Sequence, residues 1–320
     1  MASWVTVPSS LALRLLVLAR PLGAALITSL PLVGFGFALW ERGSTVSLWV
    51  VWRELALLAS SWLCLHAGAM WLNADLDRDS GPVLFGRPIE VPRAVVPAGY
   101  AALAASVAIA SLLGTVTFAC SLACALLAVL YSHPKIALKG SAIGGPLVNA
   151  LGYGALSPIA GFTAGSGIVS WRSLLTLALG ILFLLGTYFA AQVFQGDEDR
   201  RRGYRTLVVT HGPARTLAIA HACLRVAALG AIGAAIAGVY PRLLLSTLPA
   251  WIAVERHLAR WRATPSADRA AGLVGRLALC VLATVIAAYA DHFWLILSER
   301  PGGGCATAIV PEVIAPLCPK

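Results

Sequence analysis

The chain has 320 residues, of which 59% are hydrophobic and only 12% are charged, and its mean hydropathy is +0.82. This composition excludes a water-soluble protein, and the long continuous apolar runs exclude a membrane β-barrel, whose strands alternate. The formal net charge of +10 does not indicate a nucleic-acid partner, because the basic residues lie between apolar runs, as topology signals do. The sequence therefore predicts an all-α, multi-pass membrane protein.

Nine apolar segments are long enough to cross a bilayer, which takes about 20 residues per helix. In chain order, the predicted helices are 21–40, 48–72, 94–112, 115–132, 145–163, 173–194, 214–239, 241–257 and 271–297. The eighth is the weakest, because charged residues crowd its ends. We expect one membrane domain over residues 1–300, followed by a short tail with Pro and Gly over 301–320.

The basic residues lie mostly on one side of these helices. Of the 24 Lys and Arg residues, most fall on the side of the amino terminus, together with the largest polar loops. The positive-inside rule places this side in the cytoplasm. We therefore expect a protein of the cell membrane whose functional site faces the cytoplasm, with the tail that carries Cys305 and Cys318 on the outer side.

Two polar clusters of the same form, 73–78 and 195–200, interrupt the apolar chain. Each reads amide-x-Asp-x-Asp-Arg and follows directly on an apolar run. Together with Asp79, they hold six of the chain's 14 acidic residues. Carboxylates beside lipid are costly and usually functional. Their oxygen atoms suit Mg²⁺, which proteins commonly share with phosphate groups.

The spacing within each cluster places polar groups on a shared helix face. The pairs four residues apart are Asn73 with Asp77 and Gln195 with Asp199. Beside these pairs lie further carboxylates: Asp75, Asp79, Asp197 and Glu198. A single cluster of this kind is also typical of a solvated helix end. Two matching clusters on one side of the membrane favour a metal and diphosphate site, and they suggest a weak internal duplication.

Basic and aromatic residues follow the fourth and sixth predicted helices. The first loop carries Tyr131, Lys135 and Lys139, and the second carries a run of Arg that ends at Arg205. By itself, the first loop is better explained as ordinary positive-inside charge. Beside the carboxylates, however, these basic residues fit a site in which acidic side chains hold a cation while Lys and Arg hold an anion.

In their order and helix placement, these motifs resemble the UbiA superfamily of intramembrane prenyltransferases. The matching stretches are Asn73…Asp77, Tyr131…Lys135…Leu138-Lys139-Gly140, Asp199…Gly203-Tyr204-Arg205-Thr206, Asn149-Ala-Leu-Gly-Tyr-Gly154 and Arg20-Pro21. The resemblance covers about residues 12–297. It implies a bundle of nine helices with a central cavity under a cytoplasmic cap.

The resemblance also implies an activity. An isoprenyl diphosphate binds through Mg²⁺ with its tail among the helices, and the allylic cation left by the diphosphate is attacked by a hydrophobic or aromatic acceptor within the lipid bilayer. The implied metal ligands are Asn73, Asp77, Gln195 and Asp199, with Asp75 and Asp79 also at the diphosphate. The implied catalytic residues are Tyr131, Lys135, Lys139 and Arg205.

The chain departs from the family pattern at Ala74, Gly81 and Gln195, where the family has Asp. Asp75 and Asp79 restore an Asp-x-x-x-Asp spacing in a shifted register. A terpene cyclase that uses the same diphosphate site remains an alternative function. A cation transporter is a third, but transporters place their carboxylates near the middle of the membrane at broken helices, and both clusters here lie at helix ends.

Overall fold

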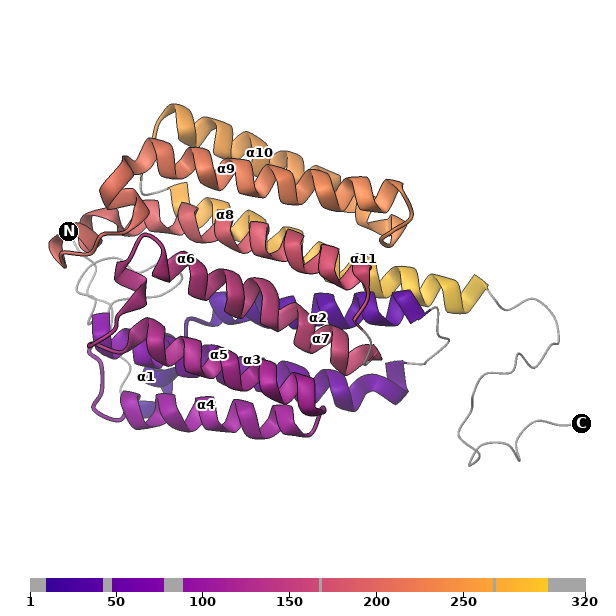
Figure 1. The fold of residues 1–320 in the computed structure, drawn as a ribbon, viewed down its shortest axis with the longest axis horizontal. Coiled ribbons are helices and arrows are strands. Elements are labelled where there is room, and N and C mark those ends of the chain that lie inside the picture. Colours follow the sequence, from indigo (N-terminus) through magenta and orange to yellow (C-terminus); the bar gives the residue numbers. More distant parts are fainter. Residues whose placement is uncertain (1–9, 43–47, 78–88, 167–168, 267–268, 299–320) are drawn as a thin grey trace, which may run out of the picture.

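The computed structural model of the chain describes residues 10–42, 48–77, 89–166, 169–266 and 269–298. Within these residues the protein is almost entirely helical (Figure 1). The α-helices are α1 Leu11–Leu18, α2 Pro21–Arg42, α3 Leu48–Asp77, α4 Val95–Ser111, α5 Thr115–Ser132, α6 Gly144–Asn149, α7 Ser157–Ser166, α8 Trp171–Arg201, α9 Leu207–Ile236, α10 Leu248–Ala263 and α11 Arg269–Ser298. The 3₁₀-helices are η1 Leu138–Gly140 and η3 Arg242–Thr247, and a π-helix, η2, spans Ala150–Leu156.

The described part of the chain has six helices that are long and apolar enough to cross a membrane. These spans are Pro21–Glu41, Val51–Asp77, Thr115–Ser132, Trp171–Arg201, Leu207–Ile236 and Gly272–Ala290, and Val95–Ser111 is a shorter apolar helix. The predicted all-α membrane class is therefore confirmed. Each of the nine predicted segments contains helix, although the fifth is divided into α6, η2 and α7, and the eighth into η3 and α10.

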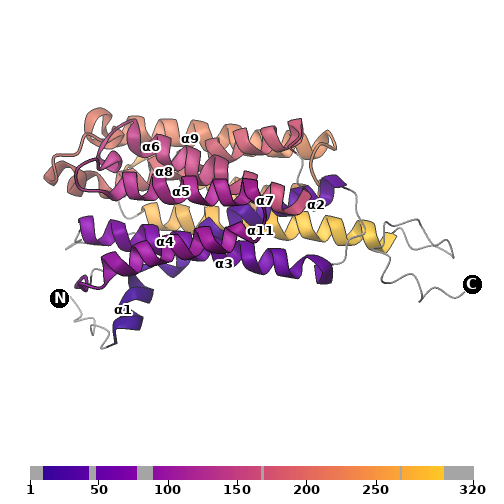
Figure 2. The ribbon, with the colours of Figure 1, turned by 60° about the horizontal axis from the view of Figure 1, so that its bottom comes forward.

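The helices form an elongated bundle with two halves. In Figure 1, α8, α9 and α10 lie along one side, α3, α4 and α5 lie along the other, and α2 and α7 lie between them. Helix α1 turns away from the bundle (Figure 2). One cluster of buried apolar side chains joins α8, α9, α10 and α11 with part of α2, and a second joins α3, α5 and α7 with the rest of α2. Helix α2 thus belongs to both cores.

The backbones of α2 and α7 touch each other. A Cβ atom on Gly161 would lie 1.8 Å from the carbonyl oxygen of Pro31, and one on Gly34 would lie 2.1 Å from that of Pro158. Only glycine fits such an approach, and small residues are what membrane helices use to pack closely. This contact fixes the middle of the bundle, on which both halves are built.

Helix α10 is short and carries a charge that had made the eighth predicted span uncertain. The carboxylate of Glu255 accepts a hydrogen bond from His221 of α9 at 2.7 Å and forms an ion pair with Arg225 of the same helix. Pairing of this kind is how charged side chains are tolerated within a membrane protein. It holds α10 against α9.

Candidate active site

The first polar cluster lies at the carboxyl end of α3 and is built around Asp77. The amide of Asn73 donates to Oδ2 of Asp77 at 2.8 Å, as the four-residue spacing predicts. Lys139 Nζ donates to Oδ1 of Asn73 at 2.8 Å and forms an ion pair with Asp77. Arg202 donates from Nη1 to Oδ1 of Asp77 at 2.6 Å and from Nη2 to its backbone oxygen at 2.9 Å. One carboxylate is therefore shared by two cations from two other segments.

The second cluster lies at the carboxyl end of α8, on the other half of the bundle. Asp199 is buried and accepts a hydrogen bond from the Thr206 hydroxyl at 2.8 Å. Glu198 forms an ion pair with Arg202 at 2.6 Å. Asp199 lies within electrostatic reach of Asp77. The two clusters therefore face each other at one end of the bundle, with Arg202 in contact with both.

A short backbone connection closes this end of the bundle. The amide nitrogen of Arg205 donates to the carbonyl oxygen of Gly140 at 2.8 Å, and Ser141 and Arg205 form an isolated parallel bridge. The ring of Tyr204 covers Gly140 so closely that a Cβ atom there would lie 2.7 Å from Cδ1 of the ring. Burial raises the pKa of the Tyr204 hydroxyl, which therefore stays protonated near neutral pH. The loops after α5 and α8 thus form one cap.

The predicted residues fall into two groups in the structure. Asn73, Asp77, Lys139 and Asp199 come together as described. The side chains of Lys135 and Arg205 are exposed. The backbone nitrogen of Lys135 donates to His133, and that of Arg205 donates to Gly140. Arg202, which the sequence reasoning did not single out, contacts Asp77, because α8 continues to Arg201 and the next residue turns back toward Asp77. The role predicted for Arg205 toward the diphosphate stays a prediction.

The chain departs from the family pattern at three positions, and the structure describes two of them, Ala74 and Gln195. Ala74 is buried against Leu18 and Val95, so it belongs to the packing of α1 and α4 on α3. Gln195 is half-buried. Asp75 is half-buried and engaged in an interaction. Asp79 and Gly81 lie outside the described residues.

Aromatic hydroxyls lie beneath the carboxylates. Tyr131, at the end of α5, lies next to the Tyr188 hydroxyl and the amide of Asn149 and within electrostatic reach of Asp77. A Cβ atom on Gly145 would lie 2.1 Å from the Tyr188 hydroxyl, so this glycine leaves the room that Tyr188 occupies. Tyr131 was predicted from sequence. Tyr188 was not, because it lies in the middle of an apolar helix with no motif around it.

Gln192 is another residue that the sequence reasoning missed. It is 3% exposed, and neither atom of its amide has a hydrogen-bond partner of good geometry among the described residues, although the Tyr188 hydroxyl is near. It lies seven residues before Asp199 and so on the same face of α8, about two turns deeper. The seven-residue spacing from Asp199 is the sequence signal that could have identified Gln192. A buried amide without hydrogen-bond partners lowers the stability of the fold, so Gln192 is a destabilising residue beside the site.

We expect Gln192→Leu to raise the thermal midpoint of the detergent-solubilised protein. The leucine keeps similar bulk and removes a buried amide whose missing hydrogen bonds cost about 1–3 kcal/mol. Thermal unfolding followed by circular dichroism measures the change, and Gln195→Leu, at a half-buried position, is the matched control. A lower midpoint for Gln192→Leu than for the parent would show that the amide is paired.

The part of the site that the structure describes offers oxygen ligands but no complete metal cage. Within the described residues, no three His, Cys, Asp or Glu side chains gather closely enough to hold a metal ion by themselves. One buried carboxylate comes from each cluster, and Asn73 adds an amide oxygen. Mg²⁺ is usually held by one or two carboxylates together with substrate phosphates. These residues therefore fit a Mg²⁺ ion that is shared with a bound diphosphate.

The fold and the site together define an all-helical membrane protein with a mixed acidic and basic site at one end. The model of the UbiA prenyltransferase family matches residues 29–279. The chain therefore belongs to this family, as its motifs indicated. No protein with a curated description matches the sequence significantly.

Solved structures of UbiA homologs share the fold. A homolog from Archaeoglobus fulgidus bound to Cd²⁺ has a TM-score of 0.64 and 20% identity, over 87% of this chain and 99% of that one. The structure of that homolog bound to GPP and Mg²⁺ gives 0.62 and 19%, over 86% and 99%. A homolog from Aeropyrum pernix K1 gives 0.56 and 20%, over 86% and 97%. At these identities the likeness is one of fold.

Proposed function

We propose that this protein transfers an isoprenyl group from an isoprenyl diphosphate to a hydrophobic or aromatic acceptor within the membrane. The observation that carries the proposal is the convergence of Asp77 and Asp199, from opposite halves of the bundle, with Lys139 and Arg202. A metal-bound diphosphate needs carboxylates that hold the metal ion and basic side chains that bind the phosphate oxygens. The structures of the A. fulgidus homolog with GPP and with DMAPP, each with Mg²⁺, support this assignment.

In the proposed reaction, Lys139 and Arg202 bind the phosphate oxygens of the donor. The allylic C–O bond breaks, and its electron pair leaves with the diphosphate. The two cations stabilise the negative charge that develops there. The acceptor then forms a bond to the allylic carbon, and the proton that it loses passes to an oxygen of the departing diphosphate. The apolar surroundings exclude water, which would otherwise capture the cation.

In this proposal, Asn73, Asp77 and Asp199 are the residues that would hold Mg²⁺ together with the diphosphate. The bound metal supplies additional positive charge to the leaving group. Lys139 and Arg202 both bind Oδ1 of Asp77. The phosphates of a bound donor would give both cations another partner, and Oδ1 of Asp77 would then be available to Mg²⁺. Mg²⁺ and the donor therefore strengthen each other's binding.

We expect turnover to require Mg²⁺ or Mn²⁺ and the affinity for Mg²⁺ to rise when diphosphate is present. Excess chelator should abolish product, and added Mg²⁺ should restore it. Calorimetric titration of Mg²⁺ with and without inorganic diphosphate measures the coupling, with a direct titration of diphosphate by Mg²⁺ as the control. Full turnover in chelator would remove the metal from the mechanism.

We further propose that the site faces the cytoplasm of the cell membrane. The excess of Lys and Arg on this side supports that orientation. The test of the activity itself is incubation of the purified protein with Mg²⁺ and isoprenyl diphosphates, with and without aromatic acceptors. Product mass separates transfer, which adds the prenyl mass to the acceptor, from cyclisation, which needs no acceptor. Absence of both would overturn the proposed function.

A further inference from the structure

A groove runs between α9 and α10, the two helices at one edge of the bundle in Figure 1. It has a volume of about 280 Å³, whereas an apolar cavity of about 150 Å³ already accommodates benzene. Most of its lining is apolar, and three of the lining side chains, Leu229, Leu248 and Ile252, are themselves exposed. The groove is therefore open along its side, toward the lipid.

Charged side chains gather around His221 at one end of this groove. The imidazole is buried, with Nη1 of Arg262 at 3.2 Å from Nδ1 and Nη2 of Arg225 at 3.1 Å from Nε2. Arg225 and Glu255 both line the groove, and the side chain of Arg225 is 52% exposed. Two guanidinium groups thus flank one imidazole at the end of an apolar groove.

The cluster carries more positive than negative charge. A guanidinium can only donate, so Nδ1 of His221 accepts from Arg262 and Nε2 donates to Glu255. The imidazole then adds no charge, and within the described residues Glu255 supplies the carboxylate that pairs with the cluster. This carboxylate balances one of the two guanidinium groups. An uncompensated charge beside lipid is costly, so the cluster is suited to bind an anion.

The groove has the orientation of a phospholipid in the leaflet nearest the carboxylate site. Helix α9 begins at Leu207, directly after the cap of that site, and helical side chains point toward the amino end of their helix. His221 and Arg225 are therefore directed toward the site's end of the bundle. Helix α10 runs back toward the same end (Figure 1), from which Arg262 reaches His221. The apolar part of the groove extends the other way, as far as Ile232.

The groove is separate from the carboxylate site. A Cβ atom on Gly186 of α8 would lie 2.5 Å from Cγ of Leu224, which lines the groove, so these two residues are at the same level. Gly186 lies 13 residues before Asp199, which is about 20 Å along the helix. A ligand of the groove is therefore not the ligand of the carboxylates.

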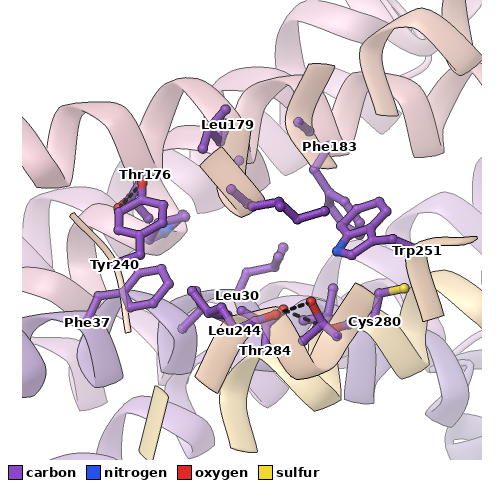
Figure 3. A pocket seen from close by; sticks show the side chains of 18 residues that line it. Leu30, Phe37, Thr176, Leu179, Phe183, Tyr240, Leu244, Trp251, Cys280 and Thr284 are labelled. Atoms are coloured by element: carbon purple, nitrogen blue, oxygen red, sulfur yellow. Dashed lines mark hydrogen bonds between the residues drawn. The ribbon is translucent and has the colours of Figure 1, made fainter. Parts of the chain in front are cut away.

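An inner cavity lies on the other side of Trp251 and does not have the same chemistry. It has a volume of about 110 Å³ and is lined by α2, α8, α9, η3 and α11, with Leu179 and Phe183 among its residues (Figure 3). Trp251 and Ile232 line both this cavity and the groove. The described residues around the inner cavity are uncharged. It has no group that would bind an anion.

We propose that the groove between α9 and α10 binds an anionic phospholipid, with the phosphate at Arg225 and Arg262 and one acyl chain along the apolar part. This inference is independent of the proposed function. A phosphate accepts charge-assisted hydrogen bonds from both guanidinium groups and supplies the negative charge that the cluster lacks. A zwitterionic lipid carries its own cation, so it gains less from the same contacts.

The charged end is tested by two substitutions of Arg on α10. Arg262→Gln removes one guanidinium from the cluster and leaves the ion pair of Arg225 with Glu255 in place. Arg260→Gln is the matched control, because Arg260 is also exposed but lies two residues earlier, about 200° away around the helix. Both variants lose the same charge from the same end of α10.

The apolar part is tested by two substitutions of Ala on α9. Ala228 lines the groove, and Ala228→Phe fills part of it. Ala231 lines the inner cavity instead, so Ala231→Phe adds the same bulk elsewhere on the same helix and is the matched control.

The experiment is native mass spectrometry of the full-length protein in detergent, titrated with dioleoylphosphatidylglycerol, dioleoylphosphatidylcholine or inorganic phosphate. One Arg near an anionic lipid contributes about fivefold in affinity. We therefore expect the parent to bind the anionic lipid at least about fivefold more tightly than the zwitterionic one, and Arg262→Gln to lose about fivefold. Ala228→Phe should also bind the anionic lipid more weakly. Arg260→Gln and Ala231→Phe should match the parent.

Four outcomes would overturn the proposal. Equal affinity for the two lipids would remove the anion from it, and equal losses in Arg260→Gln and Arg262→Gln would show a general effect of charge. Inorganic phosphate that binds as tightly as the anionic lipid would show that the groove takes no acyl chain. A dimer without bound lipid would show that a second copy of the chain covers this face. Circular dichroism establishes folding, and Arg262→Gln, at an exposed position, tests the site if Ala228→Phe does not fold.

Discussion

Asp77→Asn should lower the rate of prenyl transfer by about 100- to 1,000-fold, the usual effect of removing one electrostatic contact to developing charge. Asp77 is the group on which the proposed site converges, because Asn73, Lys139 and Arg202 all bind it. Asparagine keeps the shape and one oxygen but loses the charge that the metal needs. Single-turnover kinetics with geranyl diphosphate and an acceptor measures the effect.

Asparagine is chosen over alanine at position 77 because alanine would lower the folding stability of the protein more. The side chains of Asp77 and Lys139 are only 6% and 7% exposed. Removing one partner from a buried ion pair costs about 3–5 kcal/mol, since the other charge is left without compensation. Asp77→Ala therefore confounds loss of activity with loss of fold. Asparagine still offers an oxygen to Lys139, so Asp77→Asn should keep more of the fold.

Asp197→Asn is the matched control. Asp197 belongs to the second cluster, but its side chain is 95% exposed, and it pairs with Arg200 at 3.0 Å on the surface. Surface pairs contribute about 0–1 kcal/mol, so we expect normal folding and rates within about twofold of the parent. Near-normal turnover by Asp77→Asn would show that the wrong carboxylate had been assigned. An equal loss in both variants would indicate a general effect of charge.

The helices could be predicted from sequence because the membrane demands long apolar segments and little else. Each of the nine predicted segments contains helix in the structure. What hydropathy could not show is the division of the fifth segment. The π-helix over Ala150–Leu156 has the same composition as its neighbours and differs only in its hydrogen bonding. There the backbone N–H of Ser157 bonds the carbonyl oxygen of Gly152, which also accepts from the Ser157 hydroxyl and the Cys124 thiol.

The site was predictable where it depends on spacing within one helix, and less so where it depends on a helix end. Asn73 and Asp77 meet because they are four residues apart. The contact of Arg202 with Asp77 depends on where α8 ends, and helix ends are the least certain part of a sequence-based prediction. Four Arg residues lie within 200–205, so a shift of a few residues changes which one faces the carboxylate.

Lys139→Met and Arg202→Gln should each lower kcat by about 100- to 1,000-fold with a smaller effect on the affinity for the donor. Both cations contact the carboxylate beside which the diphosphate binds in our proposal. The leaving group carries more charge in the transition state than in the bound donor, so an interaction with it acts more on kcat than on KM. Arg202→Lys should recover only part of the rate, because one ammonium cannot replace a guanidinium that binds through two nitrogens.

Lys135→Met and Arg205→Gln are the controls for these two variants, because they remove the same charges from neighbouring exposed positions. Arg205 binds Gly140 through its backbone nitrogen, so Arg205→Gln leaves the cap in place. We expect both controls to keep kcat within about threefold of the parent, as is usual for surface positions away from a reacting group. A loss of kcat in all four variants would mean that the cap as a whole supplies the positive charge, since the effect would then follow charge number rather than contact. A loss confined to Lys135→Met and Arg205→Gln would reverse our assignment, because it would require these loops to rearrange around the donor.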